Sequence, residues 1–146
     1  MDEALSAEGS FVNFIDIGCG KGKQCIYARK YYKFAKSYGI DFSSTLVEIA
    51  NNNLTKVGYK NIEFICADAA EWKILDGDSV VFLFNPFNNV ILEKFLLNNI
   101  DHFKSYNSVI AYANDIHIDL MQELGFEIIY RFHRNSLLKY RRAISI

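Results

Sequence analysis

The sequence has a single proline in its 146 residues, and no apolar run approaches the roughly 20 residues needed to cross a bilayer. Its formal net charge is only −1, so no global charge draws the chain towards nucleic acid or an anionic membrane. Hydrophobic residues make up 51% of the chain, which is typical of a packed globule and not of a disordered one. We therefore expect one domain over residues 1–146, with residues 1–10 flexible ahead of it.

Cysteine is also scarce, and the three cysteines, Cys19, Cys25 and Cys66, show no metal-ligand spacing. An odd number of cysteines favours a reducing compartment. The first ten residues, MDEALSAEGS, are acidic and polar, unlike a signal peptide. We expect a cytoplasmic protein without a metal site and without a membrane partner.

Apolar, β-branched runs alternate with segments of helical periodicity along most of the chain. Ser43 or Ser44 is placed to cap a helix, and Gly125 is placed just after the end of another. The sequence predicts one helix after the fourth strand and one after the fifth, each with an apolar face that packs against the sheet. Those faces comprise Leu92, Phe95, Leu96 and Ile100, and then Ile116, Leu120 and Leu124. The five predicted strands cover residues 11–17, 36–41, 61–68, 79–87 and 107–115.

The last segment has a different pattern, because FEIIYRFH and LLKYRRAISI are separated only by RNS. Two strands this close together form an antiparallel hairpin. The whole pattern predicts an α/β fold, a single three-layer domain with a mostly parallel, doubly wound sheet closed by a C-terminal antiparallel hairpin. The basic residues of the hairpin are expected to form a solvated face on its edge strands. They are Arg131, Arg134, Lys139, Arg141 and Arg142.

A glycine-rich turn follows the first strand, in FIDIGCGKGKQ. Glycines let the backbone approach a ligand closely, and the following helix offers free N–H groups. A P-loop needs four residues between its glycines and then Lys-Ser/Thr, but Gly18 and Gly22 enclose three and Lys23 precedes Gln24. The dinucleotide fingerprint G-x-G-x-x-G is matched at Gly18 and Gly20 but has Lys23 in its third glycine position. This mismatch weakens the interpretation of the turn as an NAD-binding site but does not exclude it.

The run from Asp16 to Gly22, DIGCGKG, resembles the D/E-x-G-x-G-x-G motif of class I, Rossmann-like S-adenosylmethionine-dependent methyltransferases. The resemblance implies that this turn wraps the methionine end of S-adenosylmethionine, with the acidic residue helping indirectly. A zwitterionic amino acid needs N–H donors for its carboxylate and acceptors for its ammonium group, and backbone N–H groups beside a carboxylate supply both. The cofactor-binding residues implied here are Asp16, Gly18, Cys19, Gly20 and Gly22.

Two further acidic residues end the second and third predicted strands. Asp41 lies about 20 residues beyond the glycines, where a carboxylate can accept both ribose hydroxyls. The resemblance implies that Phe42 packs on the adenine, that Asp68 accepts from the adenine amino group, and that the Ala69 N–H serves a ring nitrogen. A helix cap or turn is the alternative role of each Asp. Their shared position favours binding, because open α/β sheets bind ligands at the carboxyl ends of strands.

The fourth strand ends in Asn85-Pro86-Phe87, which resembles the (N/D/S)-P-P-(Y/F/W) motif of methyltransferases that act on planar amino nitrogens. The resemblance implies catalytic roles: Asn85 and the next carbonyl accept from the target amino group, and Phe87 stacks on its plane. This chain departs from the motif in having one proline, with Asn88 where the ring should be. The alternative is a turn after a strand, with Asn88 or Asn89 capping the next helix.

Two classes of function follow from these residues. The first is an S-adenosylmethionine-dependent methyltransferase, S-adenosylhomocysteine being its product, with an unidentified acceptor that includes an amino nitrogen among the candidates. The second is an inactive cofactor-binding scaffold or partner subunit, with an NAD-binding Rossmann domain as a further alternative. Only about ten residues precede the first strand, and no insertion is visible to act as a lid. A small or external substrate, a homodimer or partner chain that completes the site, and a longer parent protein all stay open.

Overall fold

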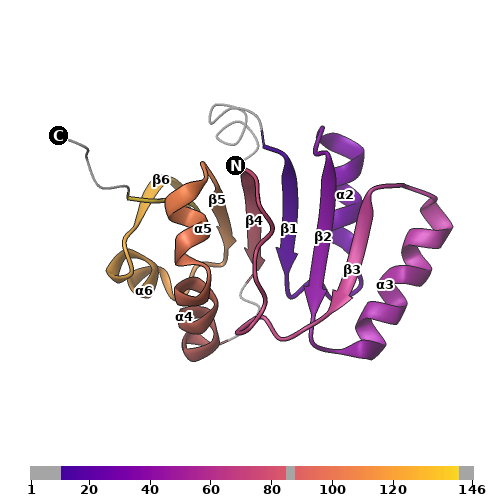
Figure 1. Ribbon diagram of the computed structural model, residues 1–146, viewed down its shortest axis with the longest axis horizontal. Coiled ribbons are helices and arrows are strands. Elements are labelled where there is room, and N and C mark those ends of the chain that lie inside the picture. The colour runs from indigo at the N-terminus through magenta and orange to yellow at the C-terminus, as the bar shows by residue number, and fades with distance from the viewer. Residues whose placement is uncertain (1–10, 85–87, 142–146) are drawn as a thin grey trace.

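A computed structural model describes residues 11–84 and 88–141, which form a seven-stranded sheet with helices on both faces (Figure 1). The strand order is β3-β2-β1-β4-β5-β7-β6. The first five strands run parallel, whereas β7 is antiparallel to both β5 and β6. The predicted fold class is confirmed. The strands are β1 (Asn13–Ile17), β2 (Lys36–Asp41), β3 (Ile62–Cys66), β4 (Ser79–Phe84), β5 (Val109–Ala113), β6 (Phe126–Phe132) and β7 (Asn135–Tyr140).

Local sequence signals mark three of the helix ends. The Ser43 hydroxyl accepts a hydrogen bond from the Leu46 N–H (3.2 Å) at the start of α3, and the Asn88 side chain accepts one from the Ile91 N–H (3.0 Å) at the start of α4. Gly125, at φ 101°, follows the end of α6. These three predicted helix ends are confirmed. The helices are α2 (Lys23–Tyr31), α3 (Ser44–Val57), α4 (Asn89–Asn98), α5 (Ile100–Ser105) and α6 (Ile118–Glu123).

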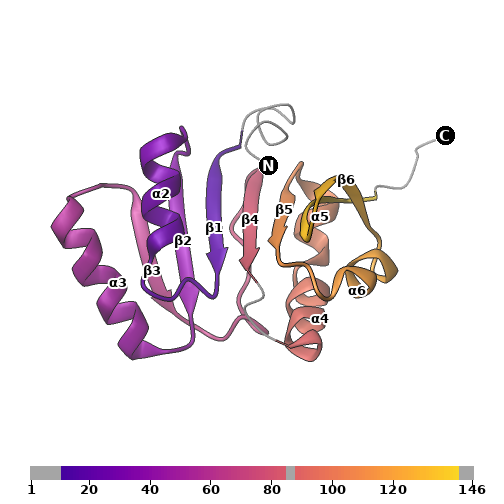
Figure 2. The same cartoon turned by 180° about the vertical axis from the view of Figure 1, so that it is seen from behind.

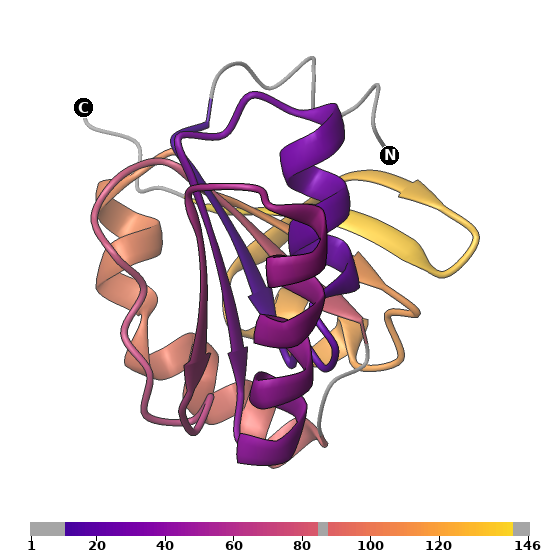
Figure 3. The ribbon, with the colours of Figure 1, turned by 90° about the vertical axis from the view of Figure 1, so that its right-hand side faces the viewer.

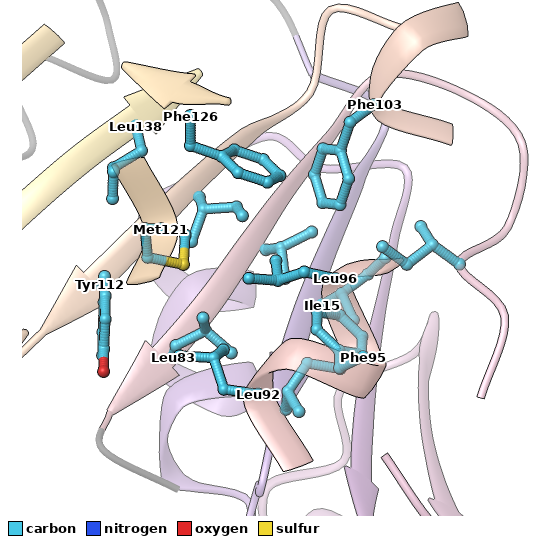
Figure 4. Close-up of a cluster of buried hydrophobic side chains, with 14 of the residues drawn as sticks. Ile15, Leu83, Leu92, Phe95, Leu96, Phe103, Tyr112, Met121, Phe126 and Leu138 are labelled. Atoms are coloured by element: carbon cyan, nitrogen blue, oxygen red, sulfur yellow. The ribbon is translucent and has the colours of Figure 1, made fainter. Parts of the chain in front are cut away.

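Helices cover both faces of the sheet (Figure 3), and a hydrophobic core lies on each face. One core packs α2 and α3 against the sheet, and the other packs α4, α5 and α6. In the second core, the rings of Phe103 and Phe126 meet edge to face with their centroids 5.1 Å apart (Figure 4). None of the described helices is long and apolar enough to span a membrane.

The single helix predicted after β4 is wrong, because Asn99 separates α4 from α5. Asn99 is buried, and its amide holds the connection from β3 to β4. Its Oδ1 accepts from the Ile74 N–H (2.8 Å), and its Nδ2 donates to the Trp72 carbonyl (2.9 Å). These bonds attach that connection to the junction between α4 and α5. The break therefore depends on contacts across about 25 positions, which a local pattern does not contain.

Further predictions differ from the structure near chain turns, where β1 and β5 are also shorter than predicted. The β6–β7 turn consists of His133 and Arg134, so β7 begins within the predicted RNS loop. Ile116 is exposed and precedes α6, whose fully buried residue is Met121. β3 ends at Cys66, two residues before the predicted end. The segment predicted to be flexible, residues 1–10, lies outside the described residues.

Candidate cofactor site

The glycine turn connects β1 to α2 and has backbone angles that favour glycine. Gly22 lies at φ 84°, and a Cβ there would come within 2.5 Å of the Phe64 ring. Gly20 lies at φ 52°, and a Cβ there would meet no other part of the chain within 4 Å, so its requirement is for backbone conformation alone. The turn is therefore held close to the sheet at Gly22 and open at Gly20.

The turn uses most of its own N–H groups within the protein. The Ile40 carbonyl accepts from the N–H groups of Gly18 (2.7 Å) and Cys19 (2.9 Å), and the Cys19 carbonyl accepts from Gly22 (3.0 Å). These donors shape the turn and do not face a ligand. In the part of the chain that the structure describes, the donors left for a ligand carboxylate include the N–H groups of Lys21 and of the start of α2, which has no side-chain cap.

Asp41 ties the end of β2 to this turn. One carboxylate oxygen accepts from the Gly20 N–H and the other from the Ser43 N–H, both at 2.9 Å. The second bond is the turn role considered as an alternative for this residue. A carboxylate oxygen has two lone-pair sites, so both oxygens can still accept a ligand hydroxyl. The structural role and the predicted ribose-binding role are therefore compatible in one side chain.

Asp16 lies behind the turn on β1 and is 3% exposed. Burial raises the pKa of its carboxyl to about 7, and the charge of Asp41 adds to the rise. Burial, followed by the charges of Asp16 and Asp41, raises the pKa of the Cys19 thiol to about 12. Cys19 is therefore a neutral packing residue of the turn at physiological pH.

A cavity of about 520 Å³ opens at the carboxyl ends of β1, β2 and β3. Asp68 lies two residues beyond β3, and one of its oxygens accepts from the Ala70 N–H (2.9 Å). Within the described part of the chain, the Ala69 N–H has no acceptor, which leaves that donor for a ligand. Phe42 is 82% exposed at the cavity. The lining residues are Gly18, Ile40, Asp41, Phe42, Cys66, Ala67, Asp68, Ala69 and Ile91.

These residues fit an adenosine-containing, positively charged cofactor. Asp41 and Asp68 offer carboxylate acceptors, Ala69 offers a donor, and the rest of the lining is largely apolar, as a base requires. Among the described residues, no group of three or more His, Cys, Asp or Glu side chains could hold a metal ion.

The structure thus places five of the predicted cofactor residues on one cavity, with Gly20 bound to Asp41 and with Asp16, Cys19 and Gly22 packed behind. Sequence reasoning missed four lining residues: Ile40, Cys66, Ala67 and Ile91. Three of them flank predicted strand ends, a signal that was present in the sequence. The three catalytic candidates, Asn85, Pro86 and Phe87, lie outside the described residues, so their roles stay predictions.

Residues 9–128 match the family model described as a methyltransferase domain. The chain belongs to this methyltransferase domain family. A curated relative, the tRNA (guanine-N(7)-)-methyltransferase of Pediococcus pentosaceus, is 31% identical to this methyltransferase domain over 108 residues. The match covers 70% of this chain and 51% of the relative, so the domain spans about half the length of that protein.

Solved methyltransferase structures share the fold of this domain. A SAM-dependent methyltransferase from Aquifex aeolicus superimposes with a TM-score of 0.73 at 16% identity, covering 94% of this chain and 87% of that one. The ribosomal protein L11 methylase of Lactobacillus delbrueckii subsp. bulgaricus gives a TM-score of 0.67 at 16% identity, with 94% and 74% covered. At this identity the likeness shows the fold alone, which is that of class I methyltransferases.

Proposed function

We propose that this methyltransferase domain binds S-adenosylmethionine in the cavity beside the glycine turn and transfers its methyl group to a nitrogen acceptor. The observation that carries the proposal is the convergence of Asp41, Asp68 and the glycine turn on one cavity at the carboxyl edge of the sheet. Open α/β sheets bind ligands at this edge. The dinucleotide alternative lacks the third glycine of its fingerprint, since Lys23 occupies that position.

The chain's own residues would divide the binding between them. Asp41, already oriented by two backbone N–H groups, would accept the ribose hydroxyls. Asp68 and the Ala69 N–H would read the adenine edge, with Phe42 beside its face. The bound cofactor supplies a methyl group on a positively charged sulfur that is already a good leaving group. Asp16, held behind the turn, supplies negative charge near this cation once it is ionised.

The acceptor is proposed to be a nitrogen with an available lone pair. Two observations support this: Asn85-Pro86-Phe87 resembles a motif of amino-nitrogen methyltransferases, and the name of the bacterial relative specifies guanine N7 of tRNA. A nitrogen lone pair needs little acid–base catalysis, so the protein would contribute mainly alignment. RNA bases are therefore the first acceptors to test.

The test is methyl transfer from labelled S-adenosylmethionine to fractionated cell extract, comparing the wild type with Asn85→Ala. Asn85→Ala should keep S-adenosylhomocysteine affinity within about tenfold and lower methylation at least about 100-fold, because alignment acts on the transition state. Asn88→Ala is the matched control, since Asn88 caps α4 and its loss tests local disruption alone.

Each outcome has a separate meaning. Equal labelling by the wild type and Asn85→Ala would remove Asn85 from the reaction, and equal losses in both variants would assign the effect to the local fold. A wild type that binds the cofactor and labels no fraction would favour an inactive scaffold, or a site that a second copy or a partner chain completes.

A further inference from the structure

Two acid-free stretches contain most of the positive charge of a chain whose net charge is −1: residues 128–146, which include most of the closing hairpin, and residues 17–40, which include α2. Between Asp16 and Asp41 the sequence contains no acidic residue. Six of the 16 Lys and Arg residues lie in that stretch, which comprises the glycine turn, α2 and the start of β2. A cluster of this kind is the electrostatic footprint of a polyanion-binding surface even when the whole chain is nearly neutral. The six are Lys21, Lys23, Arg29, Lys30, Lys33 and Lys36.

Two of these cations, Lys23 and Lys30, share one helix face with exposed aromatic rings. On α2, Lys23, Tyr27, Lys30 and Tyr31 are exposed and follow the spacing of a single helical stripe, and Lys33 is exposed just beyond the helix. We call these five residues the α2 face. The helix lies along the near side of the sheet in Figure 2. From Lys23 to Tyr31 the helix rises about 12 Å.

A series of ring contacts connects the tyrosine rings of the α2 face to the hydrophobic core. The Tyr27 and Tyr31 ring centroids lie 4.6 Å apart, and the Tyr27 ring also lies 6.5 Å from that of Tyr32. Tyr32 lies 5.8 Å from Phe34, which packs against the core. Tyr27 and Tyr31 nonetheless remain 45% and 59% exposed. Rings that are fixed and exposed form a platform on which a base can stack with little loss of conformational entropy.

The lysines of the α2 face are available for an anion. In the described part of the chain, the one ion pair formed by the six cations joins Lys36 to Glu63 (3.0 Å). The Lys30 ammonium group lies 5.2 Å from the Tyr31 ring centroid, so charge and ring occupy one small area. In a nucleic acid, bases can stack on such rings while the phosphates contact the neighbouring cations.

We propose that the α2 face binds a single-stranded segment of nucleic acid, with its phosphates against the lysines and its bases stacked on Tyr27 and Tyr31. Unpaired bases are required because a duplex hides their faces. The face begins at Lys23, directly after the glycine turn, and Gly18 of that turn lines the cofactor cavity. We therefore expect a strand bound along α2 to extend towards the cavity. The inference deepens the proposed function and rests on it for the substrate class, although binding is measurable without methyl transfer.

The test measures binding of fluorescently labelled 12-nucleotide RNA, of DNA with the same sequence, and of the annealed duplex, at several salt concentrations. Lys30→Gln/Lys33→Gln should weaken single-strand binding about tenfold near 0.1 M salt. It should also reduce the slope of log affinity against log salt by about 1.4, or about 0.7 for each lost phosphate contact. Lys94→Gln/Lys104→Gln, exposed on the α4 and α5 side of the sheet, is the matched control and should change neither value.

The stacking step has its own pair of variants. Tyr31→Ala should weaken single-strand binding at least about fivefold, whereas Tyr31→Phe keeps the ring and should bind like the wild type. Tyr130→Ala on β6, where the ring is 40% exposed, is the aromatic control. S-adenosylhomocysteine affinity is measured in every variant, so a failure of the cofactor site is distinguished from a failure of the α2 face.

Four results would overturn the proposal. These are no binding of any oligonucleotide by the wild type, losses of equal size in the control variants, preference for the duplex, and binding to phosphatidylserine vesicles without binding to oligonucleotides. The last result would assign the α2 face to an anionic membrane. Affinity for RNA over DNA of the same sequence would identify the class of nucleic acid.

Discussion

At the scale of single residues, Asp16 illustrates the cost of burying a carboxyl group. Its carboxyl is buried beside Asp41, and its pKa is raised to about 7. In the unfolded chain the same carboxyl titrates near its ordinary pKa of 3.8. Between these values the folded state binds more protons than the unfolded state, so the free energy of unfolding falls as the pH rises. The loss is complete above about pH 7, where the buried group is ionised.

Asp16→Asn should therefore stabilise the protein at pH 8 by about 2 to 4 kcal/mol, because the amide removes a buried charge. The difference should disappear near pH 4, where the wild-type carboxyl is neutral. The same variant should bind S-adenosylmethionine more weakly at pH 8, since it lacks the negative charge near the sulfonium. Urea unfolding at the two pH values and calorimetric binding test both effects. A variant that is less stable at pH 8 would contradict the burial argument.

At the scale of elements, an ion pair between a buried carboxylate and an exposed arginine joins the segment after β5 to the closing hairpin. Arg131 on β6 donates two hydrogen bonds to Asp115, at 3.0 and 2.9 Å, and the Ser136 hydroxyl also donates to that carboxylate. The Asp115 side chain is 1% exposed, while Arg131 is partly exposed. Arg131 is therefore exposed, as predicted for the basic residues of the hairpin, and it also has a structural role that the sequence did not predict.

Arg131→Met should lower the free energy of unfolding by about 2 kcal/mol, because it leaves a buried carboxylate without its cation. The value is below that for a fully buried pair since Arg131 reaches solvent. Arg141→Met is the matched control: its pair with Glu127 (2.8 Å) is exposed on both sides and should contribute little. Urea unfolding measures both, and losses of equal size would show that burial of Asp115 does not matter. Asp115→Asn should partly rescue Arg131→Met.

The sequence could predict elements whose signals are local. Ser43 lies directly before an apolar helical stripe, and Asp41 ends a short strand, so both positions were predictable. The break at Asn99 and the Arg131–Asp115 pair were not, because their partners lie 25 and 16 positions away in the chain. The same limit applies to the site. Its glycine turn was visible as a motif, whereas the bond from the Gly20 N–H to Asp41 exists only after the sheet forms.

At the scale of the whole molecule, the net charge does not describe how the charges are distributed. The net charge of −1 predicted no attraction to nucleic acid, yet the stretch between Asp16 and Asp41 carries six cations and no acid. Folding places part of this stretch on one face of α2, while the cavity presents the carboxylates of Asp41 and Asp68. The molecule thus separates an acidic pocket suited to a cationic cofactor from a basic face suited to an anionic chain.

Ligand linkage tests the whole molecule, because any ligand bound only by the folded state raises its apparent stability. S-adenosylhomocysteine at about 1,000 times its dissociation constant should add about 4 kcal/mol, whereas NAD at the same concentration should add nothing.

Asp41→Ala should weaken S-adenosylhomocysteine binding by roughly 1.5 to 3 kcal/mol, as expected for charge-assisted hydrogen bonds lost from a ligand. Thermal unfolding with and without each ligand measures these differences. Because Asp41 also fixes the Gly20 N–H, Asp41→Asn serves as the control that keeps an acceptor there. Stabilisation by NAD alone would replace the methyltransferase interpretation of the cavity with a dinucleotide one.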